Sequence, residues 1–322
     1  MSSSPVKPMI PRSIETYLTR GESEPHPAVL TKSRAVIWLS MLVAIVAFAA
    51  AGIGLFWPGG NDPATFTTLR GETVEIYGQG LYRYDTIFVG SGNKGTDAVT
   101  LFVGIPLLML SSVLYWRGSL RGGLVLIGAL TWFLYVYTSY ALGAVTYNNL
   151  FLAYVALFSA SLFALVVMFR SVDVRQLTSD FSPHMPRRGP ASFLFVSGAL
   201  TLAVWLMSPV AALIQGGPPD GLDSYTTLFT NALDSAIIVP LAFIAGMLIL
   251  KRDALGYVIA IPLLILEAFL APMIGAQTVS QLSAGVQFTT GEIVGPVSAF
   301  SVVALLAVYV SIVLLRNISD SA

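Results

Sequence analysis

The chain contains 322 residues, of which 55% are apolar and only 11% are charged, and its formal net charge is zero. Soluble domains carry about a quarter charged residues, so most of this chain must face something other than water. The balanced charge argues against a nucleic-acid partner. The sequence has no cysteine, which excludes disulfides, thiolate metal sites and cysteine nucleophiles.

Residues 1–34 are polar and contain several prolines, and we expect them to be a disordered cytoplasmic leader. Eight apolar runs follow, each long enough to cross a hydrocarbon core of roughly 30 Å. They cover residues 35–57, 98–116, 122–143, 149–169, 191–214, 229–250, 255–275 and 297–315. The sequence therefore predicts an all-α transmembrane protein with eight spans and a short tail at residues 317–322.

The basic residues predict the orientation of these spans. With a cytoplasmic amino terminus, fourteen basic residues lie in inner segments, and only Arg70, Arg83 and Lys94 lie in outer ones. Such an excess on the inner side is the usual pattern of membrane proteins. We therefore expect a multi-pass protein of the plasma (inner) membrane, in contact with the lipid bilayer, with both termini and the tail in the cytoplasm.

Two blocks of four spans resemble each other. One apolar run begins around Pro106 and stops at Arg117, and another begins around Pro240 and stops at Lys251, at the same separation. This pattern predicts duplication and fusion, with repeats at residues 35–170 and 191–316 and a cytoplasmic linker at residues 171–190. Because each repeat has four spans, both have the same orientation and are parallel four-helix repeats.

The outer loop at residues 58–97 carries strand-like alternation. Residues 73–77 and 81–89 alternate polar and apolar side chains, and the intervening Gly-Gln-Gly suits a hairpin turn. We expect a small β-hairpin on the outer face, followed by a glycine-rich turn at residues 90–95. Asp97 then falls at the start of the second span, where a carboxylate complements the helix dipole.

Glu267 is the main candidate for an ion or proton site, because it lies near the middle of the seventh span. A charge at that depth is costly and usually faces a cavity or a partner. No span has a lysine or arginine in its middle, so Glu267 is either protonated or holds a cation. Pro262 and Pro272 flank it and each frees a backbone carbonyl, which predicts a broken helix. The alternative is a neutral glutamic acid hydrogen-bonded to a neighbouring helix.

The third span carries a stripe of hydroxyl groups at helical spacing, formed by Thr131, Tyr135 and Ser139. This span is the repeat equivalent of the span that carries Glu267, and Phe133 takes the place of the acid. Hydroxyls at the seam between the repeats could hydrogen-bond Glu267 or line a polar path. Helix packing and an interfacial aromatic belt are the alternative reading.

Charged and aromatic residues gather on the predicted outer face. Arg83 lies between Tyr82 and Tyr84, with Asp85 next to them and Asp97 further on. Paired hydrogen bonds and stacking could recognise an anionic or sugar-bearing headgroup there. A salt-bridged cap that holds the hairpin is the alternative.

Glu292, within Gly-Glu-Ile-Val-Gly-Pro, either belongs to the same outer recognition surface or only starts the last helix. The two histidines, His26 and His184, are separated and predicted to be cytoplasmic, so we expect no metal site. No phosphate-binding Gly-Lys-Ser/Thr and no catalytic motif is present, and we expect no cofactor.

Several stretches resemble a group of uncharacterised prokaryotic integral membrane proteins. They are RGE at residues 70–72, YGQGLYRYD at 77–85, GTDAV at 95–99 and the segment at 291–296. The resemblance implies a polytopic membrane fold and no particular activity. One span, an outer β-rich loop ending in Tyr-Asp-Thr and three further spans are also similar to the layout of claudin-like four-span proteins, whose loop cysteines this chain lacks.

Three functions remain open on the sequence. The first is a proton- or cation-linked transporter or channel-like protein with its site at the seam between the repeats. The second is a non-catalytic scaffold or accessory subunit, bound to other membrane proteins or to copies of itself. The third is a membrane enzyme that acts on lipid-linked substrates at the outer cluster.

Overall fold

The computed structural model describes residues 30–177, 181–182 and 184–319. Nearly all of the predicted leader (residues 1–29) and the last residues of the predicted tail (320–322) lie outside this part of the chain. Within it, eight helices are long and apolar enough to cross a membrane, as the sequence predicts. These are the spans of a multi-pass membrane protein.

Five of the eight spans are single helices, and the second, sixth and seventh contain an internal irregularity. Among the first four spans, the single helices are α2 (Arg34–Phe56), α5 (Leu120–Leu142) and α6 (Phe151–Ser171). The second span consists of three consecutive parts: α3 (Ile87–Val99), the π-helical turn η1 (Thr100–Gly104) and α4 (Ile105–Arg117). A short helix, α7 (Val174–Leu177), precedes the second set. That set consists of α8 (Arg188–Gln215), then α9 (Phe229–Leu233), η3 (Asp234–Ile238) and α10 (Val239–Leu250), then α11 (Ala254–Ala268) and α12 (Leu270–Ser283), and finally α13 (Thr290–Arg316).

A hairpin stands at one end of the helices, and one of its strands is the predicted one, but the partner strand differs from the prediction. Strand β1 (Ala64–Thr67) pairs antiparallel with β2 (Thr73–Ile76) along its whole length. With the predicted partner segment, residues 81–89, β2 forms only a single antiparallel bridge, between Ile76 and Thr86. Gly78 and Gly80 do adopt positive φ, and there they turn the chain away from β2 towards α3. The expected turn is therefore present, but the segment after it forms turns and then α3 instead of a strand.

The glycine-rich segment at residues 90–95 is helical, which corrects the predicted turn. Thr86 caps α3 by accepting a hydrogen bond from the Val89 N–H (3.4 Å), so the helix begins at Ile87, eleven residues before the expected start of the span. A Cβ atom on Gly95 would collide with the backbone of Gln277 in α12. Small residues let two membrane helices approach closely, so these glycines serve packing. As a result Asp97 lies well inside the span.

The seventh span is interrupted between its two prolines. α11 ends at Ala268 and α12 begins at Leu270, with Phe269 forming the break. This agrees with the predicted broken helix. α12 continues to Ser283, beyond the predicted end of the span, so the connection to α13 shortens to residues 284–289.

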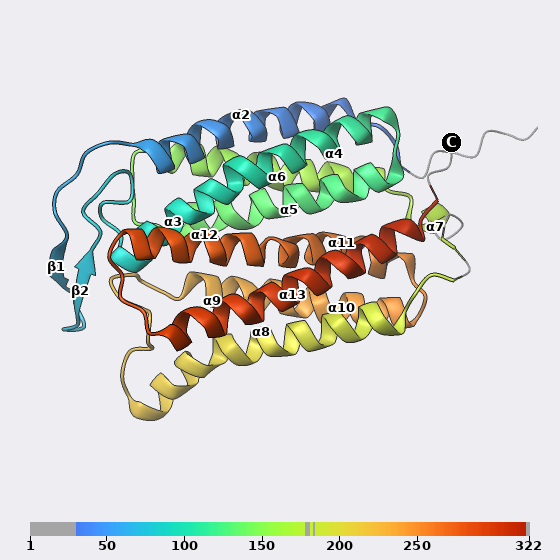
Figure 1. The fold of residues 1–322 in the computed structure, drawn as a ribbon. Helices are drawn as coiled ribbons and strands as arrows, with labels where there is room; N and C mark the ends of the chain where they lie inside the picture. Colours follow the sequence, from blue (N-terminus) through green and yellow to red (C-terminus); the bar gives the residue numbers. More distant parts are fainter. Residues whose placement is uncertain (1–29, 178–180, 183, 320–322) are drawn as a thin grey trace, which may run out of the picture.

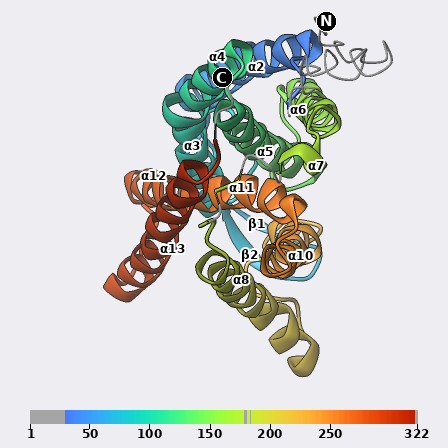
Figure 2. The same ribbon diagram turned by 90° about the vertical axis from the view of Figure 1, so that its right-hand side faces the viewer.

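The first four spans form one closed group, and the last four form a more open one. α2, α4, α5 and α6 pack against one another, and α3 and α5 join the second group by packing against α12 and α11 (Figure 1). In the second group α8 packs on α10 and α13 packs on α11 and α12, whereas α8 and α13 make little contact and point apart (Figure 2).

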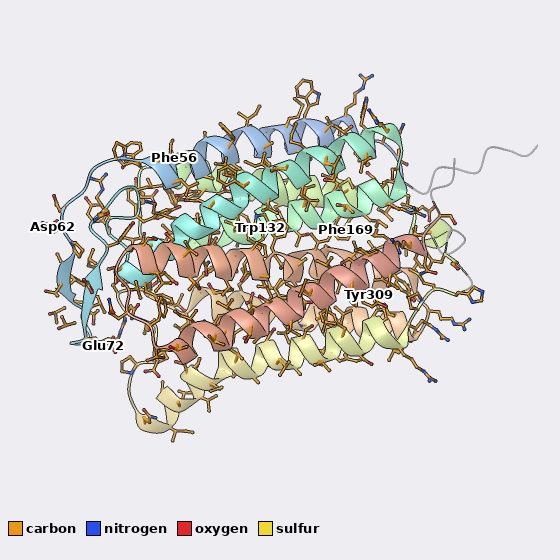
Figure 3. The ribbon with its side chains drawn as sticks, in the orientation of Figure 1. Phe56, Asp62, Glu72, Trp132, Phe169 and Tyr309 are labelled. Atoms are coloured by element: carbon orange, nitrogen blue, oxygen red, sulfur yellow. The ribbon has the colours of Figure 1, made fainter. Side chains whose placement is uncertain are left out.

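The seam between the two groups has an aromatic contact at its centre. The Trp132 ring of α5 stacks on the Phe269 ring at the break, with centroids 4.2 Å apart. Trp132 lies in the interior, whereas Asp62 and Glu72 lie at the hairpin end and Tyr309 points outwards from α13 (Figure 3). The break in the seventh span therefore lies at the junction of the two groups.

Candidate functional site

Glu267 lies at the end of α11, two residues before the break. Its side chain is half-buried, and its Oε2 atom is buried without a hydrogen-bond partner among the described residues. The Ser197 hydroxyl of α8 lies beside the carboxyl group. That hydroxyl also makes a long bond to the Leu194 carbonyl (3.4 Å). The carboxyl group therefore has one neighbouring hydroxyl, that of Ser197, and one oxygen, Oε2, that no described residue hydrogen-bonds.

The break next to Glu267 leaves backbone groups in an irregular arrangement. The Phe269 N–H is shared between the carbonyls of Ile265 (3.3 Å) and Leu266 (3.1 Å). Pro272 has no N–H to offer the carbonyl of Ala268, four residues before it. Carbonyls released in this way beside a carboxylate are the kind of ligands that membrane transport proteins use for protons and small cations.

The hydroxyl stripe of α5 does not serve Glu267 in the way the sequence suggested. Thr131 donates to the Ile127 carbonyl (2.8 Å) and Ser139 donates to the Tyr135 carbonyl (2.9 Å), so both bond within their own helix. The Tyr135 hydroxyl interacts with Asp234 of η3. The stripe is therefore divided between bonds within the helix and a contact with a different acid.

Asp234 is a second acidic group inside the spans. Its Oδ2 accepts a hydrogen bond from the Trp205 indole N–H (2.8 Å). The Asn231 side-chain amide donates a hydrogen bond to the backbone carbonyl of Trp205 (3.2 Å). Asp234 was not among the residues singled out from the sequence, although an aspartate inside an apolar run was a usable signal. In contrast to Glu267, Asp234 has defined partners on two helices.

Asp97 is the third such acid, and it is almost completely buried. Tyr82 donates a hydrogen bond to its Oδ2 (2.6 Å), so the structure brings together two residues of the predicted outer cluster. A Cβ atom on Gly54 of α2 would overlap this carboxylate, which shows how closely the helices pack around it. Rings of Tyr137, Tyr140 and Tyr154 pack around the same region. A carboxylate so enclosed leaves little space for a ligand larger than a proton.

Asp85 braces the loops at the hairpin end and is not exposed for recognition. It is 1% exposed, and its Oδ1 accepts bonds from the Thr146 N–H (2.7 Å) and the Tyr225 hydroxyl (2.8 Å). Desolvation raises the pKa of Asp85 to about 6, although both hydrogen bonds oppose the increase. The residue thus connects the first four spans to the loop between α8 and α9.

Arg83 and Tyr84 are the accessible part of the predicted outer cluster. Tyr84 is 62% exposed, and the Arg83 guanidinium lies over its ring, 5.8 Å from the centroid. Glu292 has a structural role, because Thr289 and Glu292 form a reciprocal capping box at the start of α13 (2.7 and 3.3 Å). The five outer residues and Glu292 therefore do not form one site.

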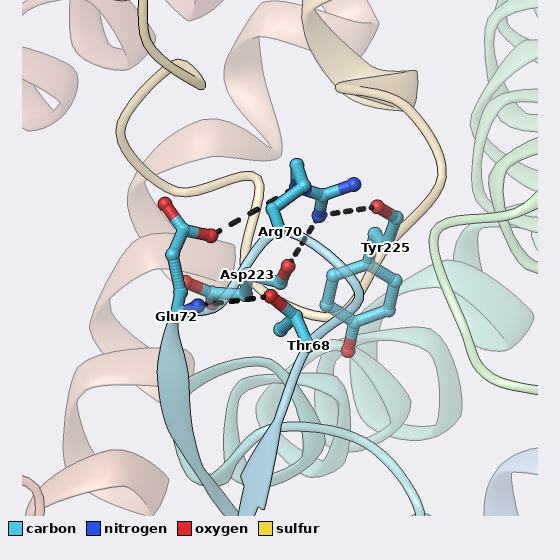
Figure 4. A network of polar contacts seen from close by, with 5 residues as sticks. All are labelled: Thr68, Arg70, Glu72, Asp223 and Tyr225. Carbon is cyan, nitrogen blue, oxygen red and sulfur yellow. Dashed lines mark hydrogen bonds and ion pairs between the residues drawn. The ribbon is translucent and has the colours of Figure 1, made fainter.

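A further network, which the sequence did not reveal, joins the hairpin to the same loop (Figure 4). The Arg70 guanidinium donates to the backbone carbonyls of Asp223 (2.6 Å) and Tyr225 (3.1 Å). Glu72 lies 3.9 Å from the Arg70 side chain, and its backbone N–H bonds to Thr68 (3.2 Å). Because the acceptors are carbonyls of a loop, no residue type in the sequence indicated this contact.

Within the described part of the chain, no group of three or more histidine, cysteine or acidic side chains is arranged to hold a metal ion. Comparison with protein-family models, with curated proteins and with solved structures gives no match. A function for this chain therefore has to be argued from its own residues, and among the acids that the structure describes Glu267 has a buried, unpartnered oxygen.

Proposed function

We propose that the protein is a membrane transport protein, of transporter or channel-like type, that binds a proton or a cation at Glu267. One observation carries the proposal: the Oε2 atom of Glu267 is buried within the spans without a partner among the described residues. An unpaired carboxylate at that depth is unfavourable unless it binds a proton or a cation. The break at Phe269 adds backbone carbonyls to the same place.

We also infer that the two sets of four spans are repeats, which would place this site at a pseudo-symmetric seam. The π-helical turns support this inference. η1 (Thr100–Gly104) and η3 (Asp234–Ile238) each come directly before a helix whose second residue is proline. π-helical turns are rare and often occur at functional sites, so the same irregularity at the same position favours a common origin.

Two glycines at equivalent positions support the same inference. A Cβ atom on Gly122 would lie 3.0 Å from the backbone carbon of Leu114, and one on Gly256 would lie 3.0 Å from that of Leu248. Each glycine thus allows a helix to pack closely on the end of the preceding helix. A site at the seam of such repeats is common among transporters.

Ligand-dependent stability tests the proposed function. We expect the melting temperature of the purified full-length chain to change with pH or with the concentration of Na⁺, K⁺ or a divalent cation, and Glu267→Gln to abolish that response. A ligand that binds only the folded state at about 100 times its Kd adds about 2.7 kcal/mol to stability. The expected shift is therefore several degrees.

Glu292→Gln is the matched control, because Glu292 is an exposed acid with a capping role. It should lower the melting temperature slightly and keep the response to pH and cations. Equal responses in the wild type and in Glu267→Gln would place ion binding elsewhere and overturn the proposal.

A scaffold or accessory-subunit function is the second candidate. It is favoured by the surfaces of α8 and α13, which expose large apolar side chains such as Met207 (71%) and Leu305 (69%). In a membrane these surfaces meet either lipid or another protein. Purification in a mild detergent, followed by mass spectrometry, should reveal a partner at fixed stoichiometry if this candidate is correct.

A further inference from the structure

The second set of spans opens laterally at the hairpin end. α8 buries residues mainly between Pro190 and Gly198, and beyond them only Ala212 is buried. α13 buries no residue before Ala304. In the half nearer the hairpin α8 and α13 therefore bury few residues and point apart (Figure 2), although α8 still contacts η3 and α13 still packs on α12. We call the space between residues 199–215 of α8 and residues 290–303 of α13 the lateral opening.

Glu267 lies at the inner end of this lateral opening. Its carboxyl group is next to Ser197, and Ser197 and Gly198 are where α8 begins to lose its buried face. α11 packs on α5, α10 and α13, whereas the Ser197 neighbour of Glu267 belongs to α8, so the carboxyl group faces α8. Residues 260–266 of α11 are buried, whereas Glu267 is partly exposed. Part of the Glu267 side chain is thus exposed next to α8, while its Oε2 atom is buried beneath the point where α8 and α13 diverge.

The walls of the lateral opening are apolar and the surrounding charge is negative. Residues 189–250 and 253–315 contain no lysine or arginine. The acids of this region at or towards the hairpin end are Asp220, Asp223, Asp234, Glu267 and Glu292. Arg70 reaches the loop at residues 223–225 from the hairpin, and its guanidinium is bound to two backbone carbonyls. The electrostatic field therefore favours a cation.

We propose that the lateral opening binds an amphipathic organic cation, which enters from the bilayer and pairs its positive charge with Glu267. This inference rests on the proposed function and adds the class of substrate to it. An apolar body would replace lipid against α8 and α13, while the charge would satisfy the unpartnered oxygen of Glu267. A small hydrated ion would have to lose its water along the same apolar walls, which is costly.

Binding of tetraphenylphosphonium to the full-length chain in lipid nanodiscs tests this inference, since the probe has a permanent charge and an apolar body. We expect saturable binding by the wild type and binding weaker by at least about 30-fold in Glu267→Gln, because one member of a buried charge pair is lost. Asp62→Asn, at an exposed position outside the lateral opening, should bind like the wild type. Triphenylphosphine oxide, a neutral analogue, should not compete.

The possible outcomes separate this inference from the proposed function. Equal binding of tetraphenylphosphonium by Glu267→Gln and the wild type would overturn the inference, because the probe would then be held by apolar contact alone. Stabilisation by protons or inorganic cations through Glu267, without binding of tetraphenylphosphonium, would overturn the inference and leave the proposed function standing. A chain that responds to neither, with both variants folded, would overturn both.

Discussion

At the scale of single residues, the acids inside the spans differ in whether their carboxylate oxygens have hydrogen-bond partners. Asp97 accepts a bond from Tyr82 and Asp234 accepts one from Trp205, whereas Oε2 of Glu267 has no partner among the described residues. Removing a buried carboxylate from water costs several kcal/mol unless partners replace the water. Glu267 is the candidate for ligand binding because its carboxylate lacks a hydrogen-bond partner at Oε2, and not only because it lies deep in a span.

Asp85 gives a prediction about pH. Its pKa rises from 3.8 to about 6 on folding, so the folded state binds the proton more tightly than the unfolded state. The contribution of Asp85 to stability is therefore greatest below about pH 4 and is lost as the pH rises to about 6, a change of at most about 3 kcal/mol. Asp85→Asn keeps an acceptor for Thr146 and Tyr225 but does not titrate.

We therefore expect the melting temperature of Asp85→Asn to vary less between about pH 4 and pH 6 than that of the wild type. Asp62→Asn, at an exposed position in the hairpin region, is the control and should follow the wild type. If the pH profile of Asp85→Asn has the slope of the wild type, Asp85 is not the group that titrates in this window.

At the scale of elements, the α3–α12 contact depends on small residues. The glycine-rich segment 90–95 permits close approach, and Gln277 donates to Thr96 Oγ1 (2.8 Å) across the contact. Van der Waals packing and such polar bonds are the main attractions between helices in lipid, because apolar burial gains little there. The contact between the two groups of spans should therefore be sensitive to one added methyl group.

Gly95→Ala tests this sensitivity. The added Cβ would overlap the backbone of Gln277, and overpacking of this kind costs about 1–3 kcal/mol. We expect a lower melting temperature. Gly52→Ala is the matched control, since Gly52 of α2 has open space around it and alanine favours a helix by about 1 kcal/mol. A Gly95→Ala protein as stable as the wild type would show that α3 and α12 can separate without loss.

At the scale of the whole molecule, the hairpin end ties the two groups of spans together outside the helices. Arg70 and Asp85 both bind the loop at residues 223–225, one through its backbone and the other through the Tyr225 hydroxyl. These contacts come from segments about 150 residues away in sequence. They fix the loop that connects α8 to α9, and hence one boundary of the lateral opening.

Tyr225→Phe removes one of these contacts while retaining the ring. Loss of a hydrogen bond costs about 1 kcal/mol, which corresponds to an increase of about fivefold in local opening. We expect hydrogen exchange at residues 216–228 to become faster by about that factor, with little change in the spans. Tyr309→Phe, at an exposed position of α13, should leave exchange in this loop unchanged.

The sequence by itself determined the number of spans, most of their boundaries and the position of Glu267 inside the seventh span. These follow from local quantities, namely the length of apolar runs and the cost of a charge within them. Only the tertiary structure decided that the glycines of α3 pack on α12, that β2 pairs with β1, that Tyr135 faces Asp234 and that Ser197 lies beside Glu267. Each of these depends on which segments meet in space, and glycine, hydroxyl and carbonyl groups can serve many partners equally well.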